Sequence, residues 1–470
     1  MKKTALIFLL ISAYNFLISQ DLNSVEGSWQ GEISVQNINT TLVLDIYPDS
    51  SSKIIASLPK MASINHKASK IKFTEGTLSF NVVNLAYSFD LTLKNDSLHG
   101  FAQGMRSKKI EHISLFKTEN PLRVNRPQTP KPPFSYKEEI IVVKNKKAKI
   151  SLEGTLTIPS GEGPFPTVIL VTGSGPQDRD SEVFMHKIFW VIADYLSSRG
   201  VAVFRYDERG VGKSTGNFAQ ATSFDFAQDL SYIFKQIKKH PKVGKLGVLG
   251  HSEGGLVAAI VASKNKKCDF VISLAGPAVN GKEILLEQAK QMYILEGKDK
   301  NFLNFEIEVR SYIFELYGKS KDATSFAQDL RAYFEKLQSE ISQEKAKRHN
   351  ISPKVAEVWI LQLSSAWMKE YIKTDPYKYW RKLKCPTLVL IGDKDFQVPY
   401  HQNMPIYEKA FKEAKNSNAN MMKIKSANHL FQICEKGSMD EYASIEESIS
   451  PKVLEIISNW IKQTTNRDEK

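Results

Sequence analysis

The sequence predicts an α/β fold: a mostly parallel, doubly wound sheet with a helical cap insertion, preceded by a small all-β domain. Three observations support this fold class. Two apolar stretches flank a sharp turn at residues 250–254, apolar and polar residues alternate before residue 118, and about a hundred residues before residue 380 have helical apolar spacing. At 470 residues the chain is too long for one compact core and suits about two or three domains.

The character of the sequence changes along the chain and indicates its domain organisation. The expected order is a signal peptide (1–20), an all-β module (21–118), a Pro-rich linker (119–136), the first part of the α/β core (137–280), a helical cap (281–380) and the second part of the core (381–470). An insertion after the sixth strand of such a sheet is expected to lie over the carboxyl ends of the strands.

The first twenty residues have the pattern of an export signal. Lys2 and Lys3 precede an almost wholly apolar run at 5–17, which is too short to span a bilayer. Cleavage is expected near Ser19 or Gln20, and because no cysteine follows the run, a lipoprotein anchor is excluded. The mature chain is expected to be soluble in the periplasm or outside the cell, without an integral membrane segment.

Residues 21–118 show the alternation of antiparallel strands. Large apolar side chains occupy every second position in 42–46, 78–82 and 87–93, and turn residues such as Asn95 separate the runs. A small barrel or sandwich is expected. The sequence does not decide whether this module binds a substrate or a surface, or only assists folding and docking. A stiff, extended linker follows, marked by Pro121, Pro127, Pro130, Pro132 and Pro133.

Residues 250–254, Gly-His-Ser-Glu-Gly, are expected to form a nucleophile elbow. A buried strand is predicted at 246–249 and a helix at 254–261, so the turn between them lifts the Ser252 hydroxyl above the carboxyl end of a parallel sheet. The glycines allow strained dihedral angles and close packing of strand and helix. Gly-x-Ser-x-Gly alone is common in ordinary turns, and the flanking elements are what predict Ser252 as a nucleophile.

A serine nucleophile needs a histidine to take its proton and a carboxylate to orient that histidine. In hydrolases built on a parallel sheet the order along the chain is Ser, then Asp or Glu, then His. Asp393 and Asp395 follow a predicted strand at 385–392, and their position alone leaves the choice between them open. His429 follows a strand-like run at 421–425 and is the predicted base.

The other histidines of this region are expected to have ordinary structural positions. His251 adjoins the serine, but neighbours in sequence point apart at a sharp turn, so it is not expected to be the base. His186, His240, His349 and His401 lie in polar or helical surroundings and are expected at the surface.

Backbone N–H groups must stabilise the charge that develops on the substrate oxygen. One is expected from Glu253, the residue after the nucleophile, whose side chain is expected to be solvated. The second is expected from the loop at 172–176, where Ser174 is the predicted donor and Gly173 or Gly175 are the alternatives.

Composition and motifs exclude several function classes. Residues 207–216 end like a phosphate-binding loop, but Asp207 stands where that loop needs a glycine, so nucleotide binding is not expected. The net charge of +13 comes from lysines spread along the chain without interleaved aromatic residues, which argues against nucleic-acid binding. No metal-ligand cluster is found, the three cysteines form no spaced framework, and no cofactor is expected.

These motifs together resemble the α/β-hydrolase superfamily, and more narrowly the bacterial serine aminopeptidase-like (S33) esterases and hydrolases. The residues that carry the resemblance are 172–180, 206–214, 250–255, 392–399 and 428–432, and it covers about residues 137–465. The resemblance implies an α/β-hydrolase core and selects Asp395 over Asp393, because the acid of this group follows a Gly-x-x-Asp pattern. Thr172 is a departure, since many relatives have histidine there, but the backbone donors stay intact.

The cap is expected to shape the acyl or alcohol pocket and to exclude water. Its large aromatic residues are expected mainly to pack in the cap's own core. They are Tyr293, Tyr312, Trp359, Trp367, Tyr371 and Trp380.

The combined expectation is an exported serine hydrolase that cleaves carboxylic esters through Ser252, His429 and Asp395 and an acyl-enzyme, with the amides of Ser174 and Glu253 as the oxyanion hole. The expected substrate is a small-molecule ester or a short peptide. The alternatives are a serine aminopeptidase or other peptidase, an acyltransferase, and a binding protein with a silent hydrolase fold. Acyl chain length and oligomeric state are not decided by the sequence.

Overall fold

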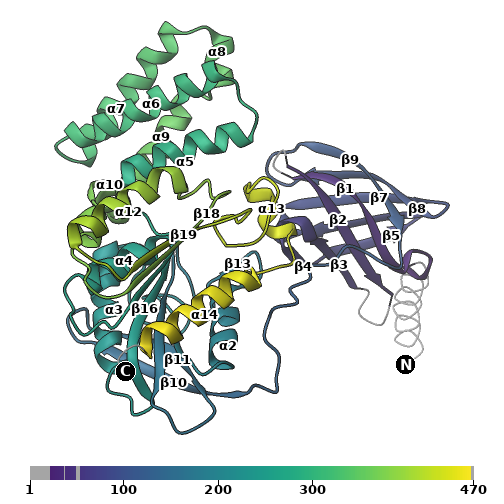
Figure 1. The fold of residues 1–470 in the computed structure, drawn as a ribbon. Coiled ribbons are helices and arrows are strands. Elements are labelled where there is room, and N and C mark those ends of the chain that lie inside the picture. The colour runs from purple at the N-terminus through teal and green to yellow at the C-terminus, as the bar shows by residue number, and fades with distance from the viewer. Residues whose placement is uncertain (1–21, 36–37, 49–52, 467–470) are drawn as a thin grey trace. The chain divides into compact units, whose positions relative to one another are not determined.

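A computed structural model describes residues 22–35, 38–48 and 53–466 of the chain (Figure 1). The predicted signal peptide, residues 1–20, lies outside the described residues. The chain divides into two compact units, Met1–Pro127 with Met439–Glu446, and Gln128–Ser438 with Glu447–Lys470.

The first unit is one antiparallel sheet. Its strands are β1 (Gly27–Val35), β2 (Ile38–Tyr47), β3 (Lys53–Leu58), β4 (Ser63–Lys67), β5 (Ser69–Thr74), β6 (Thr77–Val82), β7 (Tyr87–Lys94), β8 (Ser97–Gly104) and β9 (Ile110–Lys117). They are ordered β4-β3-β2-β1-β9-β8-β7-β6-β5. Short 3₁₀ turns lie at Asn23–Val25, Pro59–Met61 and Val83–Leu85.

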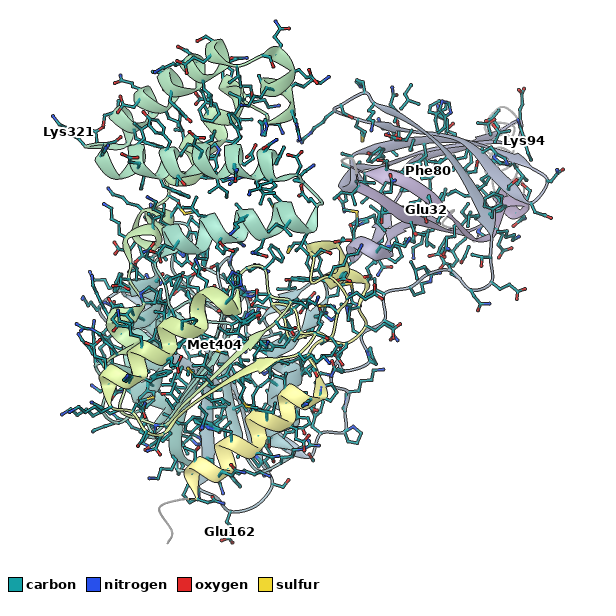
Figure 2. All side chains as sticks on the ribbon, turned by 45° about the horizontal axis from the view of Figure 1, so that its top comes forward. Glu32, Phe80, Lys94, Glu162, Lys321 and Met404 are labelled. Atoms are coloured by element: carbon teal, nitrogen blue, oxygen red, sulfur yellow. The ribbon has the colours of Figure 1, made fainter. Side chains whose placement is uncertain are left out.

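Alternating apolar side chains of this sheet gather in a single core. Trp29 is 1% exposed, and its indole N–H donates to the carbonyl of Val25 at 2.8 Å. Phe80 and Phe89 stack with ring centroids 4.9 Å apart on neighbouring strands, and Phe80 lies inside the curled sheet (Figure 2). The period-two pattern therefore predicts the all-β class of this unit correctly, because every second side chain of a strand points to the same face.

A short helix from far along the chain completes the first unit. Helix α13 (Met439–Ser444) belongs to it, and the Arg126 guanidinium donates to the carbonyls of Ala443 at 2.7 Å and Ile445 at 3.2 Å. Tyr442 of this helix is buried. No local pattern in the sequence predicts this arrangement, which depends on contacts between residues more than 300 positions apart.

The second unit is built on a mostly parallel sheet. Its strands are β10 (Tyr136–Asn145), β11 (Ile150–Pro159), β12 (Phe165–Val171), β15 (Ala202–Tyr206), β16 (Val243–His251), β17 (Val271–Leu274), β18 (Thr387–Gly392) and β19 (Ala419–Ile424). Their order is β10-β11-β15-β12-β16-β17-β18-β19, and β11 runs antiparallel to both of its neighbours. A separate two-stranded ribbon pairs β13 (Glu182–Val183) with β14 (His186–Lys187).

Helices cover both faces of this sheet. α2 (Ile188–Ser197) and α14 (Pro451–Thr465) lie on one face, and α3 (Ser223–Ile237) and α4 (Glu253–Ala262) lie on the other (Figure 1). α12 (Tyr400–Ala414) also packs on the core, which its Met404 contacts (Figure 2). Because helices bury both faces, the central strands are mostly apolar, and the predicted doubly wound fold class is confirmed.

The cap comprises seven helices between β17 and β18. They are α5 (Gly281–Leu295), α6 (Lys300–Lys319), α7 (Ala323–Glu340), α8 (Gln343–Arg348), α9 (Pro353–Leu363), α10 (Ala366–Lys373) and α11 (Tyr377–Trp380). Ile313, Leu330 and Phe334 belong to an apolar core of its own. Trp380 is fully buried, whereas Tyr312 is 43% exposed.

A buried polar cluster lies inside this cap. His349 Nδ1 lies 3.0 Å from a carboxylate oxygen of Glu306, and the hydroxyl of Tyr293 donates to the other oxygen at 2.9 Å. The expectation that His349 lies at the surface is therefore wrong. Its ring packs between Phe302 and Phe305, a contact that the charged residues around it in sequence do not predict.

Two general features concern membranes and cysteines. In the part of the chain that the structure describes, every helix is too short or too polar to cross a bilayer. Cys268, Cys385 and Cys434 are free thiols.

The core of the first unit generates a stability prediction. Trp29→Ala removes a buried indole and its hydrogen bond, so we expect the free energy of unfolding to fall by about 3–5 kcal/mol. Phe116, which is 58% exposed on the same sheet, provides the control, and Phe116→Ala should change stability by less than about 0.5 kcal/mol. Urea denaturation, with hydrogen exchange at β1 and β2, measures both. Equal losses in the two variants would contradict this assignment of the core.

Candidate active site

The parallel strands deliver several loops to one edge of the sheet. The segments after β12, β15, β16, β17, β18 and β19 all start at the carboxyl ends of these strands. The strand order reverses beside β12, and such switch points are where open α/β sheets bind ligands. The candidate site is therefore at this edge.

Ser252 occupies a strained turn between β16 and α4. Its backbone angles are φ 54° and ψ −124°, in a region that L-residues rarely adopt. A Cβ on Gly250 would lie 2.0 Å from the carbonyl oxygen of Gly254, and a Cβ on Gly254 would lie 2.2 Å from that of Val171. Glycine is required at both positions because backbone segments already touch there.

Asp395 and His429 form a buried pair. His429 Nδ1 lies 2.8 Å from Asp395 Oδ2, and both residues are 4% exposed. Asp395 Oδ1 accepts hydrogen bonds from the backbone N–H groups of Gln397 at 2.8 Å and Val398 at 2.9 Å. With Nδ1–H donated to this carboxylate, the imidazole has Nε2 available as a base.

Asp393 has a different role in the structure. Its Oδ1 accepts a hydrogen bond from the backbone N–H of Ser426 at 2.6 Å, and its own N–H donates to the carbonyl of Ile424 at 3.0 Å. The side chain therefore joins the loops after β18 and β19, and Asp395 rather than Asp393 contacts His429.

His251 connects the nucleophile turn to the His429 loop. Its Nε2–H donates to the carbonyl oxygen of His429 at 2.9 Å, and the two ring centroids are 4.8 Å apart. Burial, with a smaller effect from His429, lowers the pKa of His251 to about 3. A neutral imidazole with its Nε2–H donated to a carbonyl is a structural link, and no pattern in the sequence indicates it.

A second buried network supports the His429 loop. The Asn428 side-chain oxygen accepts hydrogen bonds from the N–H groups of Leu430 and Gln432, both at 3.0 Å. Gln432 in turn lies 3.0 Å from His186 Nε2, and the other ring nitrogen of His186 lies 2.9 Å from Ser448 Oγ. His186 is fully buried, so its expected surface position is wrong. Long-range packing against Ser448 buries it.

The candidate oxyanion loop lies against Ser252. A Cβ built on Gly173 would lie 3.0 Å from Ser252 Cβ. Within the described residues, the N–H groups of Ser174 and Glu253 donate to no other protein atom, and the same is true of Gly173 and Gly175. All four amides are therefore available to an oxyanion, and the choice of Ser174 as second donor stays a prediction.

Glu208 holds the far side of this loop. Its carboxylate accepts hydrogen bonds from the Thr172 hydroxyl at 2.6 Å and from the Gln177 N–H at 3.1 Å. Burial raises the pKa of Glu208 to about 8, and the nearby charge of Glu253 adds to the rise. Thr172, the residue that departs from the family pattern, thus has a defined partner here.

The Glu253 side chain is buried rather than solvated, which corrects the expectation from sequence. It is 3% exposed, and its Oε1 accepts hydrogen bonds from Ser223 Oγ at 2.5 Å and from the Trp367 indole N–H at 2.8 Å. The Ser174 side chain is also within hydrogen-bonding reach. The sequence around Glu253 gives no signal that its side chain is buried, because the residues that bury it come from α3 and from the cap.

The loop at 207–216, whose sequence ends like a phosphate-binding motif, is occupied by the side chain of Asp207. Asp207 accepts hydrogen bonds from the Arg179 guanidinium and from the N–H of Lys213 at 2.9 Å. A Cβ on Gly212 would lie 2.5 Å from the same carboxylate. The aspartate thus takes amide donors that an anion would need.

A cavity of about 680 Å³ lies along the outer side of α3 and α4. Phe224, Phe234 and Val261 line it together with five lysines, and Ser252, Asp395 and His429 do not. We do not assign the candidate active site to this cavity. No group of three or more His, Cys, Asp or Glu side chains able to hold a metal ion occurs among the described residues.

Comparison with known proteins confirms the family resemblance. Residues 187–433 match the family described as serine aminopeptidase, S33. Esterase EstD of Thermotoga maritima is 27% identical over 330 residues, which are 70% of this chain and 68% of that protein. Among solved structures, the Pyrococcus furiosus esterase Pf2001 is 16% identical with a TM-score of 0.44, covering 74% of this chain and all of that one. Est1E of Butyrivibrio proteoclasticus, with bound ferulic acid, is 17% identical with a TM-score of 0.39, covering 70% and 100%.

The buried neutral His251 predicts a pH-dependent stability. The pKa of His251 is about 3 in the folded protein against an ordinary value of 6.5. Its contribution to the free energy of unfolding is therefore complete above pH 6.5 and is lost as the pH falls toward 3. The raised pKa of Glu208 gives the opposite dependence, with stability lost as the pH rises from about 4.5 toward 8.

Comparison with His251→Gln isolates the histidine, because glutamine can donate to the His429 carbonyl but does not titrate. We expect the stability advantage of the wild type over this variant to shrink steadily between pH 6.5 and 4 in urea denaturation. A difference that stays constant across this range would show that His251 is not held neutral.

Proposed function

The chain belongs to the serine aminopeptidase, S33, family of α/β-hydrolases and is a hydrolase, and from that premise we propose that it is an exported serine esterase. The observation that carries the proposal is the buried Asp395–His429 pair, which His251 ties to the strained turn bearing Ser252. The named esterase relative supports the ester class of substrate. Export is supported by Lys2, Lys3 and the apolar run at 5–17.

The proposed reaction has two steps that share one base. Ser252 Oγ attacks the ester carbonyl carbon while His429 Nε2 takes its proton, and Asp395 stabilises the imidazolium. The amides of Ser174 and Glu253 donate to the resulting oxyanion. Collapse breaks the bond to the alcohol, which receives the proton from His429. Water, activated by the same histidine, then attacks the acyl-serine and releases the acid.

An ester is favoured over a peptide with a free amino terminus. An aminopeptidase needs an exposed acceptor, usually a carboxylate, for the charged α-amine of its substrate. Glu208 and Glu253, two carboxylates beside the oxyanion loop, are buried and already accept hydrogen bonds from the protein. A peptidase is the second candidate, because the family itself is described as serine aminopeptidase.

The first test is a substrate panel on the purified protein and on Ser252→Ala. We expect turnover of p-nitrophenyl esters, and the variant should lose activity by a factor on the order of 10⁶ in kcat while keeping the wild-type melting temperature. Aminoacyl p-nitroanilides are the competing substrates. Anilide turnover without ester preference would favour the peptidase, and activity that survives in the variant would remove Ser252 as the nucleophile.

A second test ranks the two aspartates after β18. Asp395→Asn removes the carboxylate that orients His429, so kcat should fall by a factor on the order of 10⁴. Asp393→Asn keeps an oxygen acceptor for the Ser426 N–H and should lower kcat by less than about tenfold. Steady-state kinetics on one ester decides between them. The reverse ranking would assign the acid to Asp393.

A further inference from the structure

The side chain of Glu253 brings three separate elements together beside the nucleophile. It is the first residue of α4, directly after Ser252. Ser223, at the start of α3, and Trp367, on cap helix α10, both donate to its Oε1. Ser174, in the candidate oxyanion loop, is within hydrogen-bonding reach of the same carboxylate.

This carboxylate is in an environment that opposes its charge. Burial raises the pKa of Glu253 above its ordinary value, although the hydrogen bonds from Ser223, Trp367 and Ser174 act in the opposite direction. Burying an ionised carboxylate costs free energy, and the direction of the pKa change indicates that its hydrogen bonds offset this cost only in part. Stability alone therefore does not explain a carboxylate at this position.

The contacts instead suit a positioning role. The backbone amides of Ser174 and Glu253 are the proposed oxyanion donors, and Ser174 lies near enough to the Glu253 carboxylate to lower its pKa slightly. Glu208 holds the same loop through Thr172 and Gln177. Glu253 thus has both parts of the role: its backbone amide is a proposed donor, and its side chain is fixed by Ser223 and Trp367.

Trp367 extends this link into the cap. Its ring stacks on Tyr371, with centroids 4.8 Å apart on the same helix. A Cβ on Gly281, the first residue of α5, would lie 2.4 Å from the carbonyl oxygen of Tyr371. Helix α10 is therefore packed tightly against the segment where the cap begins, and a shift of this part of the cap would displace the indole that holds Glu253.

We propose that the Glu253 side chain is a positioning residue that couples cap helix α10, through Trp367, to the oxyanion hole. The proposal rests on the proposed function, since it assigns to Glu253 a role in the same acyl-transfer site. It predicts that breaking the link lowers kcat more than it raises KM, because oxyanion donors act mainly in the transition state.

The test compares two tryptophans of the cap. Trp367→Phe removes the indole donor and keeps an aromatic ring to stack on Tyr371. Trp359→Phe is the matched control, because Trp359 packs in the cap on Phe314 and Arg310. Glu253→Gln removes the charge while preserving the shape. We expect kcat on a p-nitrophenyl ester to fall by about tenfold in Trp367→Phe and in Glu253→Gln, with KM within about threefold of wild type and Trp359→Phe unchanged.

The double variant Trp367→Phe, Glu253→Gln decides whether the two residues act together. If the two residues form one link, kcat of the double variant should be no lower than kcat of the more impaired single variant. If they act independently, the two losses in kcat should multiply. Multiplied losses, or an unchanged kcat in Trp367→Phe, would overturn the proposal. Should Glu253→Gln fail to fold, Ser223→Ala removes a different donor to Glu253, and the same cycle with Trp367→Phe applies.

Labelling of Ser252 by a fluorophosphonate separates this proposal from the proposed function. The rate of labelling depends on the nucleophile and the oxyanion hole, and labelling proceeds even if the protein does not hydrolyse esters. A wild-type protein that is labelled but hydrolyses no ester contradicts the esterase, and about tenfold slower labelling of Trp367→Phe would still support the coupling. Equal labelling of wild type and Trp367→Phe, or no labelling of the wild type, overturns the coupling.

Discussion

The close approach of backbone segments at the nucleophile turn is the constraint on which the rest of the site depends. At Gly250 and Gly254 the strand, the helix and the end of β12 are too near one another for a Cβ. This contact forces Ser252 into its strained conformation and places the start of α4 beside the oxyanion loop. The strain can persist only because the strands and helices on both sides are buried and apolar.

Because the turn is buried, the polar groups around it need partners inside the protein. His251 donates to the His429 loop, Asn428 closes that loop on itself, and Glu208 holds the oxyanion loop. Asp395 completes the arrangement by orienting the His429 imidazole. The geometry of the candidate active site is thus part of one buried hydrogen-bonded framework, and the cap enters it through Trp367.

The parts that the sequence predicts well are those with local signals. The strand, turn and helix around Ser252 follow from apolar periodicity and glycine spacing, and the alternation before residue 118 follows from the pleat of a strand. Three predictions were wrong where distant contacts set the burial of a side chain. His186 and His349 are buried by partners far away in sequence, and Glu253 is buried by residues of α3 and α10.

The sequence by itself determined the fold class and the order of the candidate triad, because periodicity and short motifs are properties of neighbouring residues. The family resemblance selects Asp395 as the acid, and the tertiary structure adds that Asp395 contacts His429 while Asp393 joins two loops. Only the tertiary structure decided that His251 is a neutral link and that a glutamate beside the nucleophile contacts the cap. The physical reason is the same in each case: a side chain's partners and its burial depend on residues that the fold brings together from distant positions.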